Sequence, residues 1–425
     1  MTIELSCLWV MKMPKTKTSA SYGNKLDVFL LEQFVGSITL DKDECNFFIF
    51  DRDYVADLNR PVLSLCFRST YGGLRDHVYS RRQQLHPFFS NLMPEGELRQ
   101  FIAAGLKINP EREFFLLAAL GADLPGAIIV KYHNGVSDSE LEQSAKQRKS
   151  EKTDKLFKFS LAGVQLKFSA FLESSGKLTI RASGKNGDHI IKVPSPRHHQ
   201  LPEAEYATMK LAQLMGIETA EVALTQTNEI INLPEDIRSR GGSTLSVKRF
   251  DRGPNGRVHI EDFAQVFEKY PANKYEGVAY HDIAIVLNTV QGISGVIEFV
   301  RRLVFTIGTG NADMHLKNWS LIYRDGKNPE LAPAYDLVPT IAFHKDNELG
   351  LSLGREKHMS AITLDHFAKF AAKAQLSSKL VKNTVKDAVE QYLTVWSNNK
   401  DSLPFPPLVR KKIEEHINRL ELFKG

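Results

Sequence analysis

Hydrophobic and polar residues alternate near the start of the chain. Leu26–Leu40 alternates on both sides of a polar corner at Glu32 and Gln33, which predicts a β-hairpin. Apolar residues take helical spacing from His86 until Gly121, and a glycine is typical of a helix end. The other segments with a strand pattern are 46–50, 62–67 and 126–132. The pattern therefore predicts a β-rich N-terminal subdomain that also contains helices.

A second stretch of strands follows and then gives way to helices. The segments with a strand pattern are 157–161, 165–172, 177–182, 189–193 and 244–251. A helix is predicted between the last two, with Pro202 in its first turn and Gly216 at its end. After Ile260 nearly every apolar run has helical spacing. The pattern predicts a small β-rich lobe and a larger all-α lobe, and a cleft between such lobes is a natural ligand site.

The segment between these two stretches is mostly charged. Few apolar residues occur from Ser137 until Leu156, which is typical of a solvated linker. We therefore predict an α+β protein with five parts. These are a tail at 1–25, the N-terminal subdomain at 26–136, a charged linker at 137–156, the small lobe at 157–255 and the helical lobe at 256–425.

Composition narrows the class of protein. Hydrophobic residues make up 42% and charged residues 25% of the chain, which is ordinary for a soluble globular protein, and a net charge of +5 does not indicate nucleic-acid binding. The three cysteines, Cys7, Cys45 and Cys66, lack metal-ligand spacing and fit a reducing cytoplasm. No apolar run approaches the roughly 18 residues of a membrane span, and the N-terminus makes a poor signal peptide.

The stretch GNADMHLKN, residues 310–318, places several polar side chains directly after an apolar helix. Asp313 and Asn318 have the spacing of a phosphotransferase catalytic loop, in which the Asp takes the proton of the attacking hydroxyl and the Asn binds Mg²⁺. Lys317 would neutralise charge on the transferred phosphoryl group. Asp336, after a possible strand, would supply a second oxygen ligand for Mg²⁺.

Two other interpretations of this stretch remain. Its polar residues could form a hydrogen-bonded loop that caps the neighbouring helices. His315 could bind zinc, but no second His or Cys lies at ligand spacing. The pattern D-x-H-x-K-N followed by Y-D favours phosphoryl transfer over both.

Phosphoryl transfer also requires a nucleotide site, and the small lobe offers candidate residues. Ala162, Gly163 and Val164 lie between predicted strands, where backbone N–H groups could approach phosphates, although such a glycine is also common in a plain turn. Lys192 lies inside an apolar strand, so its ammonium either reaches solvent at an edge or neutralises a phosphate. Glu205 could pair with Lys192 as in kinases, or simply favour a helix N-terminus.

The strand at 244–250 would connect the two lobes. Phe250 at its end is a candidate neighbour of adenine, or else a core residue. Phosphate loop, strand lysine, connector and catalytic loop follow one another along this chain in the order found in kinases. This order carries more weight than any one of the four signals.

These motifs resemble the HipA-like serine/threonine kinases, the toxin components of bacterial toxin–antitoxin systems. The segments that carry the resemblance are FSLAGVQLKF (159–168), HIIKVPSP (189–196), VKRFDR (247–252), GNADMHLKNWSLI (310–322) and LAPAYDLVPT (331–340). The similarity runs from about Lys25 to the C-terminus. It implies a two-lobed fold related to the phosphatidylinositol kinases, and the use of ATP and Mg²⁺.

The resemblance also implies roles for individual residues. Asp313 would be the catalytic base, and Asn318 and Asp336 would bind Mg²⁺. The nucleotide would contact the phosphate loop, the strand lysine, the hinge and the catalytic loop. These contacts would come from Ala162, Gly163, Val164, Gln165, Lys167, Lys192, Lys248, Arg249, Phe250, His315, Lys317, Asn318 and Tyr335, with Glu205 as the ion-pair partner of the lysine.

Family members autophosphorylate a serine just before the phosphate loop, which ejects the loop and inactivates the kinase. Ser160 occupies that position here, although it could also be an ordinary strand serine. Lys248 stands where the family often has an acid, and Met314 where glycine is frequent. Neither change affects the base or the metal ligands, so we expect an active kinase.

The resemblance further implies partners. The usual partner is a HipB-like helix-turn-helix antitoxin on a separate chain, which binds operator DNA, so contact with DNA would be indirect. The best-known targets are aminoacyl-tRNA synthetases, whose phosphorylation halts translation. Two alternatives to a toxin kinase are a small-molecule phosphotransferase and a corepressor that binds the antitoxin with little catalysis.

Overall fold

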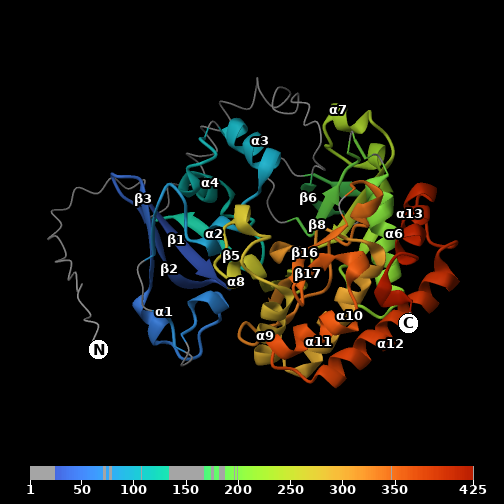
Figure 1. Cartoon of the computed structure of the whole chain (residues 1–425). Coiled ribbons are helices and arrows are strands. Elements are labelled where there is room, and N and C mark those ends of the chain that lie inside the picture. The colour runs from blue at the N-terminus through green and yellow to red at the C-terminus, as the bar shows by residue number, and fades with distance from the viewer. Residues whose placement is uncertain are drawn as a thin grey trace, which may run out of the picture.

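The computed structural model describes residues 24–69, 73–75, 79–106, 108–133, 167–173, 177–180, 187–195, 197–198, 200–345 and 347–424. Figure 1 shows an N-terminal unit around a blue sheet on one side and the C-terminal helices, in orange and red, on the other. The predicted tail lies almost wholly outside the described residues, and so do the linker at 137–156 and the predicted strand at 157–161.

An antiparallel five-stranded sheet with the order β4-β3-β2-β1-β5 forms the N-terminal unit. Its strands are β1 (Lys25–Leu30), β2 (Gln33–Leu40), β3 (Cys45–Phe50), β4 (Tyr79–Arg82) and β5 (Ile128–Tyr132). Its helices are α1 (Arg52–Ala56), α2 (Pro87–Ser90), α3 (Gly96–Leu106) and α4 (Glu113–Leu120). The predicted hairpin is confirmed, and its two-residue turn at Leu31 and Glu32 has positive φ at both positions, which suits the strand twist.

The predicted strand at 62–67 is wrong. Leu65–Phe67 forms a 3-10 turn, and the Ser64 hydroxyl accepts a hydrogen bond from the backbone N–H of Cys66 at 3.1 Å. Cys66 and Phe67 are buried in the core of the N-terminal unit. A short apolar run does not distinguish a strand from another buried segment, so packing decided the conformation.

A second five-stranded sheet, with the order β7-β6-β8-β10-β9, forms the small lobe. Its strands are β6 (Lys167–Leu172), β7 (Leu178–Thr179), β8 (His189–Lys192), β9 (Val222–Gln226) and β10 (Ser243–Lys248). Helix α6 (Leu201–Leu214) begins with a proline in its first turn, as predicted. Its buried Ala207 and Leu211 belong to the same core cluster as Leu245 of β10, so this helix packs against the sheet.

The rest of the chain is mainly helical. Its helices are α8 (Phe263–Val266), α9 (Tyr280–Val290), α10 (Ile293–Thr309), α11 (Leu364–Lys373), α12 (Ser378–Asn399) and α13 (Pro407–Ile417). Helix α10 is buried along most of its length and ends at Gly310, whose φ of 69° places it in the left-handed region common at helix ends. None of the helices that the structure describes is long and apolar enough to cross a membrane.

The α+β class is confirmed, but the second lobe is not all-α. It contains β13 (His259–Asp262), β14 (Ser320–Tyr323) and β15 (Glu330–Leu331) in one sheet, and the pair β16 (Glu348–Leu353) and β17 (Glu356–His358). A further small pair is β11 (Arg252–Gly253) and β12 (Gly256–Arg257). All four residues of β14 are buried, so the strand lacks the apolar–polar alternation by which sequence reveals strands.

Buried polar contacts join the N-terminal unit to the rest of the chain. The Glu261 carboxylate on β13 accepts a hydrogen bond from the Leu65 backbone N–H at 3.0 Å and another from the Ser64 hydroxyl. Asp123 pairs with Arg252 at 2.9 Å and with Arg249 at 3.2 Å. Both sets of contacts are sheltered from solvent, so the two parts of the chain form one packed molecule.

Candidate functional site

The loop that follows α10 presents Asp313 at the surface on an anchored backbone. The side-chain oxygen of buried Asn311 accepts a hydrogen bond from Asp313 N at 3.0 Å, and the Thr340 hydroxyl accepts one from Ala312 N at 2.7 Å. The Asn318 amide donates to the Asp313 carbonyl at 2.7 Å. The Asp313 side chain itself is 53% exposed. The loop therefore holds one accessible carboxylate in a defined place.

A cluster of charged groups joins the two lobes. Lys192 on β8 is 4% exposed, and its Nζ contacts the carboxylate of Glu205 on α6 and that of Asp336, the latter at 2.5 Å. Lys167 Nζ, at the start of β6, lies 3.1 Å from the second Asp336 oxygen. The Lys192–Glu205 ion pair expected from the sequence is confirmed. Asp336 extends this pair to a cluster, because its carboxylate contacts both Lys192 and Lys167.

Burial and charge act against each other in this cluster. Burial alone would raise the pKa of Asp336, but Lys167 and Lys192 outweigh it and hold that pKa well below its usual range. Burial would lower the pKa of Lys192, yet Asp336 and Glu205 raise it. Burial keeps the pKa of Glu205 above its ordinary value in spite of Lys192. At neutral pH Lys192 is therefore an ammonium and Asp336 a carboxylate.

Asp336 and Asn318 offer oxygen donors of the kind that Mg²⁺ prefers. The amide nitrogen of Asn318 is used by the Asp313 carbonyl, and among the described residues no group donates to its side-chain oxygen. Asp336 has a φ of 57°, in the left-handed region, which an Asp tolerates better than most residues. Its carboxylate already accommodates two cationic groups. The donor set therefore fits a magnesium ion.

His315 lies behind Asp313 and is only 5% exposed. Burial lowers the pKa of its imidazole to about 4, despite the attraction of Asp313, so the ring is neutral near pH 7. Its Nε2 is 3.8 Å from an Asp313 oxygen, too long for a hydrogen bond. The ring meets that of Tyr275 edge-on, with centroids 5.0 Å apart. Contact of His315 with a nucleotide stays a prediction.

Lys317 points toward the N-terminal unit. Its Nζ lies 2.7 Å from Glu95 and donates to the backbone carbonyl of Asn91 at 3.1 Å. Lys274 approaches the other Glu95 oxygen at 3.0 Å. Burial opposes ionisation of Glu95, but the two lysines lower its pKa. The ammonium of Lys317 thus has a partner that its spacing did not indicate, and its predicted contact with a phosphoryl group stays untested.

The three residues of the predicted hinge, 248–250, have side chains in different surroundings. Lys248 forms an exposed ion pair with Glu221 at 3.0 Å. The buried guanidinium of Arg249 contacts Asp251 at 2.8 Å and Asp123 at 3.2 Å, so its side chain belongs to the contact with the N-terminal unit. The ring of Phe250 lies 5.8 Å from that of Tyr335.

Tyr335 links the ion cluster to the catalytic loop. Its hydroxyl donates to the Lys317 carbonyl at 2.8 Å and lies 2.6 Å from the Ser320 hydroxyl. Burial raises its pKa far above the ordinary value, so the phenol stays protonated. Because Asp336 is the next residue, these bonds fix it relative to Asp313.

Most of the predicted phosphate loop lies outside the described residues. This applies to Ser160, Ala162, Gly163, Val164 and Gln165. Lys167, at the end of the predicted loop, is described and is exposed except where it pairs with Asp336. The roles of the loop and of Ser160 remain predictions.

Three residues that the sequence did not single out contact the catalytic loop. Tyr275 donates a hydrogen bond to the Asp313 carboxylate, the Lys274 carbonyl accepts one from Leu316 N, and Glu95 holds Lys317. No spacing rule connects these segments, because they meet only in the folded chain. The role of Asn311 could have been found, since an Asn commonly accepts a hydrogen bond from the backbone N–H two residues later.

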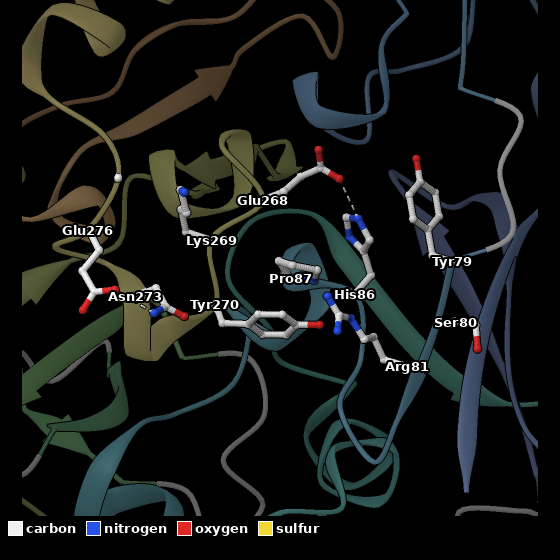
Figure 2. A pocket seen from close by; sticks show the side chains of 11 residues that line it. Tyr79, Ser80, Arg81, His86, Pro87, Glu268, Lys269, Tyr270, Asn273 and Glu276 are labelled. Atoms are coloured by element: carbon white, nitrogen blue, oxygen red, sulfur yellow. Dashed lines mark hydrogen bonds and ion pairs between the residues drawn. The ribbon is translucent and has the colours of Figure 1, made fainter. Parts of the chain in front are cut away.

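A cavity of about 630 Å³ lies between the N-terminal unit and the segment Glu268–Gly277. Figure 2 shows its lining, including the contact of His86 Nε2 with a Glu268 oxygen at 3.1 Å. The lining residues are Tyr79, Ser80, Arg81, His86, Pro87, Glu268, Lys269, Tyr270, Asn273, Glu276 and Gly277. None of the predicted site residues lines it, so it is distinct from the Asp313–Lys192 site.

Two family matches cover most of the chain. Residues 26–131 match the HipA N-terminal domain, and residues 159–396 match the HipA-like C-terminal domain. The first match contains the N-terminal sheet, and the second contains both the ion cluster and the catalytic loop.

Individual proteins show the same similarity. A Sinorhizobium fredii protein named "Putative kinase Y4dM" is 42% identical over 402 residues, which are 94% of this chain and 98% of that one. The Serine/threonine-protein kinase toxin HipA of Shewanella oneidensis is 27% identical over 64% of this chain and 66% of its own length. The solved structure of Shewanella oneidensis HipA with HipB and operator DNA superposes with a TM-score of 0.69 at 22% identity, covering 93% of this chain and 96% of that chain. At that identity the structural match establishes the fold.

Proposed function

The chain belongs to the HipA family, and we propose that it is a kinase that transfers the γ-phosphoryl group of ATP to serine or threonine hydroxyls of a protein. The observation that carries the proposal is the meeting of two lobes at one set of charges. Lys192 of the small lobe contacts Asp336 of the helical lobe. Tyr335 then ties Asp336 to the loop that bears Asp313.

The chemistry that we propose for these residues is that of a kinase active site. Asp313 accepts the proton of the substrate hydroxyl while the hydroxyl oxygen bonds to the γ-phosphorus and the bond to the ADP oxygen breaks. Lys192, kept protonated by its two acids, holds phosphate oxygens. Glu205, which is buried and contacts Lys192 Nζ, would position that ammonium.

A magnesium ion would be held by Asn318 and Asp336. When bound, it would supply charge neutralisation to the phosphoryl oxygens. Phe250 and Tyr335, whose rings lie together at the lobe junction, would border the nucleotide. The backbone N–H groups of Lys248 and Arg249 already donate to the carbonyls of Glu221 and Asp188.

A toxin role within a toxin–antitoxin pair extends this proposal. It is supported by similarity to a protein named as a kinase toxin and by the fold shared with a HipA–HipB–DNA complex. The partner would be a HipB-like helix-turn-helix antitoxin, and operator DNA would be contacted through it. The target would be a translation component such as an aminoacyl-tRNA synthetase.

Phosphate transfer by the purified chain tests the kinase. With radiolabelled ATP and a pool of serine-containing peptides, Asp313→Asn should lower transfer at least about a hundredfold, because it removes the base. Asp365→Asn is a matched control, since Asp365 is an exposed acid on α11 that forms a surface ion pair with Lys382. Phosphate found only on a small-molecule acceptor would contradict protein phosphorylation and favour a metabolite phosphotransferase.

The toxin role has a separate test in cells. Induced wild-type protein should arrest growth, whereas the Asp313→Asn variant should not, and phosphoproteomics after brief induction should name the target. Equal arrest by both proteins would instead indicate an antitoxin-binding corepressor.

Autophosphorylation at Ser160 is a further part of the proposal. Incubation with ATP should add one phosphate to the intact mass, and Ser160→Ala should lose it while retaining transfer to peptides. A phosphate mapped to another residue would rule out Ser160 as the regulatory site.

A further inference from the structure

The proposed catalytic carboxylate, that of Asp313, is already hydrogen-bonded to a tyrosine hydroxyl. Tyr275 donates a hydrogen bond to Asp313 Oδ1, and its ring is supported edge-on by that of His315. A catalytic carboxylate takes the proton of an acceptor hydroxyl that lies within hydrogen-bond distance. Tyr275 therefore places its own hydroxyl where the substrate hydroxyl must come.

The segment that carries Tyr275 is fixed to the catalytic loop by its backbone. Leu316 N donates to the Lys274 carbonyl at 3.2 Å, and Lys274 Nζ pairs with Glu95 at 3.0 Å. These bonds hold the residue before Tyr275 from both sides. The backbone of Tyr275 is therefore attached to this loop through its neighbour Lys274, independently of its own side chain.

The Tyr275 side chain is partly open to solvent. Tyr275 is 39% exposed, and the Asp313 side chain is also open to solvent. The neighbouring residues Asn273, Glu276 and Gly277 line the cavity of about 630 Å³. Gly277 has a φ of 67°, a conformation that favours glycine, so the chain turns sharply after the tyrosine. Figure 2 shows this segment facing β4 across the cavity.

We propose that Tyr275 gates the acceptor position, so that a substrate serine or threonine must displace its hydroxyl from Asp313 before transfer. The proposal rests on the kinase function proposed above and adds a specificity residue to it. Only an acceptor that gains enough binding from its flanking peptide residues can displace the tyrosine. Free hydroxyl compounds and water, which lack such contacts, compete poorly for the base.

The gate predicts a change in KM more than in kcat. Tyr275→Phe keeps the ring against His315 and removes only the competing hydroxyl. The KM for a serine-containing peptide pool should fall about tenfold, with kcat and the KM for ATP nearly unchanged, because the competing state disappears. Tyr270→Phe is the matched control, since its hydroxyl lies on the same segment but donates to the Leu85 carbonyl at 3.1 Å, so its peptide KM should not fall.

Three results would overturn the gate. A peptide KM that is unchanged or higher in Tyr275→Phe would show that the hydroxyl does not compete. An equal fall in KM in Tyr270→Phe would assign the effect to the segment and not to the hydroxyl on Asp313. Phosphate mapped to Tyr275 after incubation with ATP would make the tyrosine an acceptor instead of a gate.

A second measurement tests the contact without any phosphate transfer. A double-mutant cycle with Tyr275→Phe, Asp313→Ala and the double variant reports their coupling in urea denaturation. Non-additive midpoints support the contact, and strictly additive midpoints would overturn it whatever the activity. If the midpoints are non-additive but the chain transfers no phosphate, the contact exists and the proposed kinase fails, and the gating role fails with it. If the chain transfers phosphate but the midpoints are additive, only the gate fails.

Discussion

Lys192 carries its charge in a strand position that is almost completely buried. A buried ammonium is stable there only because two carboxylates surround it, and its raised pKa reflects their attraction. The same arrangement keeps Asp336 ionised at low pH. At the residue scale the cluster is therefore a set of fixed charges assembled before any phosphate arrives.

Removal of the lysine should affect both stability and activity. Lys192→Met leaves Glu205 and Asp336 without their shared cation, so the free energy of unfolding should fall by about 3–5 kcal/mol. Transfer of phosphate to peptides should fall at least about a hundredfold in protein that remains folded. Denaturation in urea and the transfer assay measure the two effects.

Lys382→Met is the control for this variant. Its ion pair with Asp365 lies at the surface, at 3.3 Å, so its loss should cost under about 1 kcal/mol and leave transfer intact. A Lys192→Met protein as stable and active as this control would contradict the role of the cluster.

Glu95 shows how one residue can attach the catalytic loop to a distant part of the chain. Glu95→Gln removes the carboxylate that Lys274 and Lys317 share, so the loop should lose an anchor and kcat should fall severalfold. The lowered pKa of Glu95 means that its contribution to stability is present above about pH 4.5 and is lost as the pH falls below that value. Between pH 7 and pH 3 the free energy of unfolding should therefore fall less in the variant than in the wild type, as measured by denaturation.

Glu218→Gln controls for this prediction, since Glu218 pairs with Arg324 at the exposed surface. It should change neither kcat nor the fall in unfolding free energy at low pH. If the unfolding free energy of Glu95→Gln falls at low pH as much as that of the wild type, Glu95 is not held ionised by its two lysines.

At the scale of elements, the end of α10 decides where Asp313 lies. Gly310 ends the helix in a left-handed conformation, and a Cβ built there would lie 2.5 Å from the Ile341 side chain. Ile341 N in turn donates to the Gly310 carbonyl at 3.2 Å, next to Thr340, which holds the loop. The close packing at this point therefore sets the direction in which the chain leaves α10 toward Asp313.

Gly310→Ala should therefore destabilise the protein and displace the loop. The left-handed backbone alone costs an alanine about 1–2 kcal/mol, and the contact with Ile341 adds to this. Gly241→Ala is a matched control, because Gly241 has a φ of 65° and no atom within 4 Å of a built Cβ. The urea midpoint should fall further for Gly310→Ala than for Gly241→Ala, and equal falls would show that the Ile341 contact has no effect.

At the scale of the whole molecule, the N-terminal unit is joined to the kinase-like lobes through buried charges. Glu261 on β13 lies in this contact and receives hydrogen bonds from Ser64, Leu65 and Tyr323. Burial raises the pKa of Glu261 to about 7, although these hydrogen bonds oppose the shift. The folded protein thus binds this proton more tightly than the unfolded chain does.

This proton makes the contact between the N-terminal unit and the lobes sensitive to pH in a defined direction. Because the pKa is raised on folding, the stabilisation is full below about pH 4.5 and is lost as the pH rises through 7, by up to about 3 kcal/mol. Glu261→Gln should have a flatter dependence of unfolding free energy on pH between 5 and 8 than the wild type. Glu421→Gln, an exposed acid paired with Lys424, should keep the wild-type slope.

Much of the site could be predicted because its signals are local. Asp313 and Asn318 are five residues apart, and one loop brings them together whatever the rest of the fold does. Lys192 and Glu205 are joined by a single strand-to-helix connection, so their spacing was enough to predict the ion pair. Residues 26–40 show strand alternation on both sides of a polar corner, which was enough to predict the hairpin.

The sequence by itself thus determined the α+β class, the N-terminal hairpin and the local pairs of the site. Tertiary structure decided the partners of Lys317, Arg249 and Asp313, which come from residues far along the chain: Glu95, Asp123 and Tyr275. It also decided the 3-10 turn at 65–67 and the strand β14. The physical reason is that periodicity and spacing record only neighbours along the chain, whereas burial and charge pairing depend on which distant surfaces pack together.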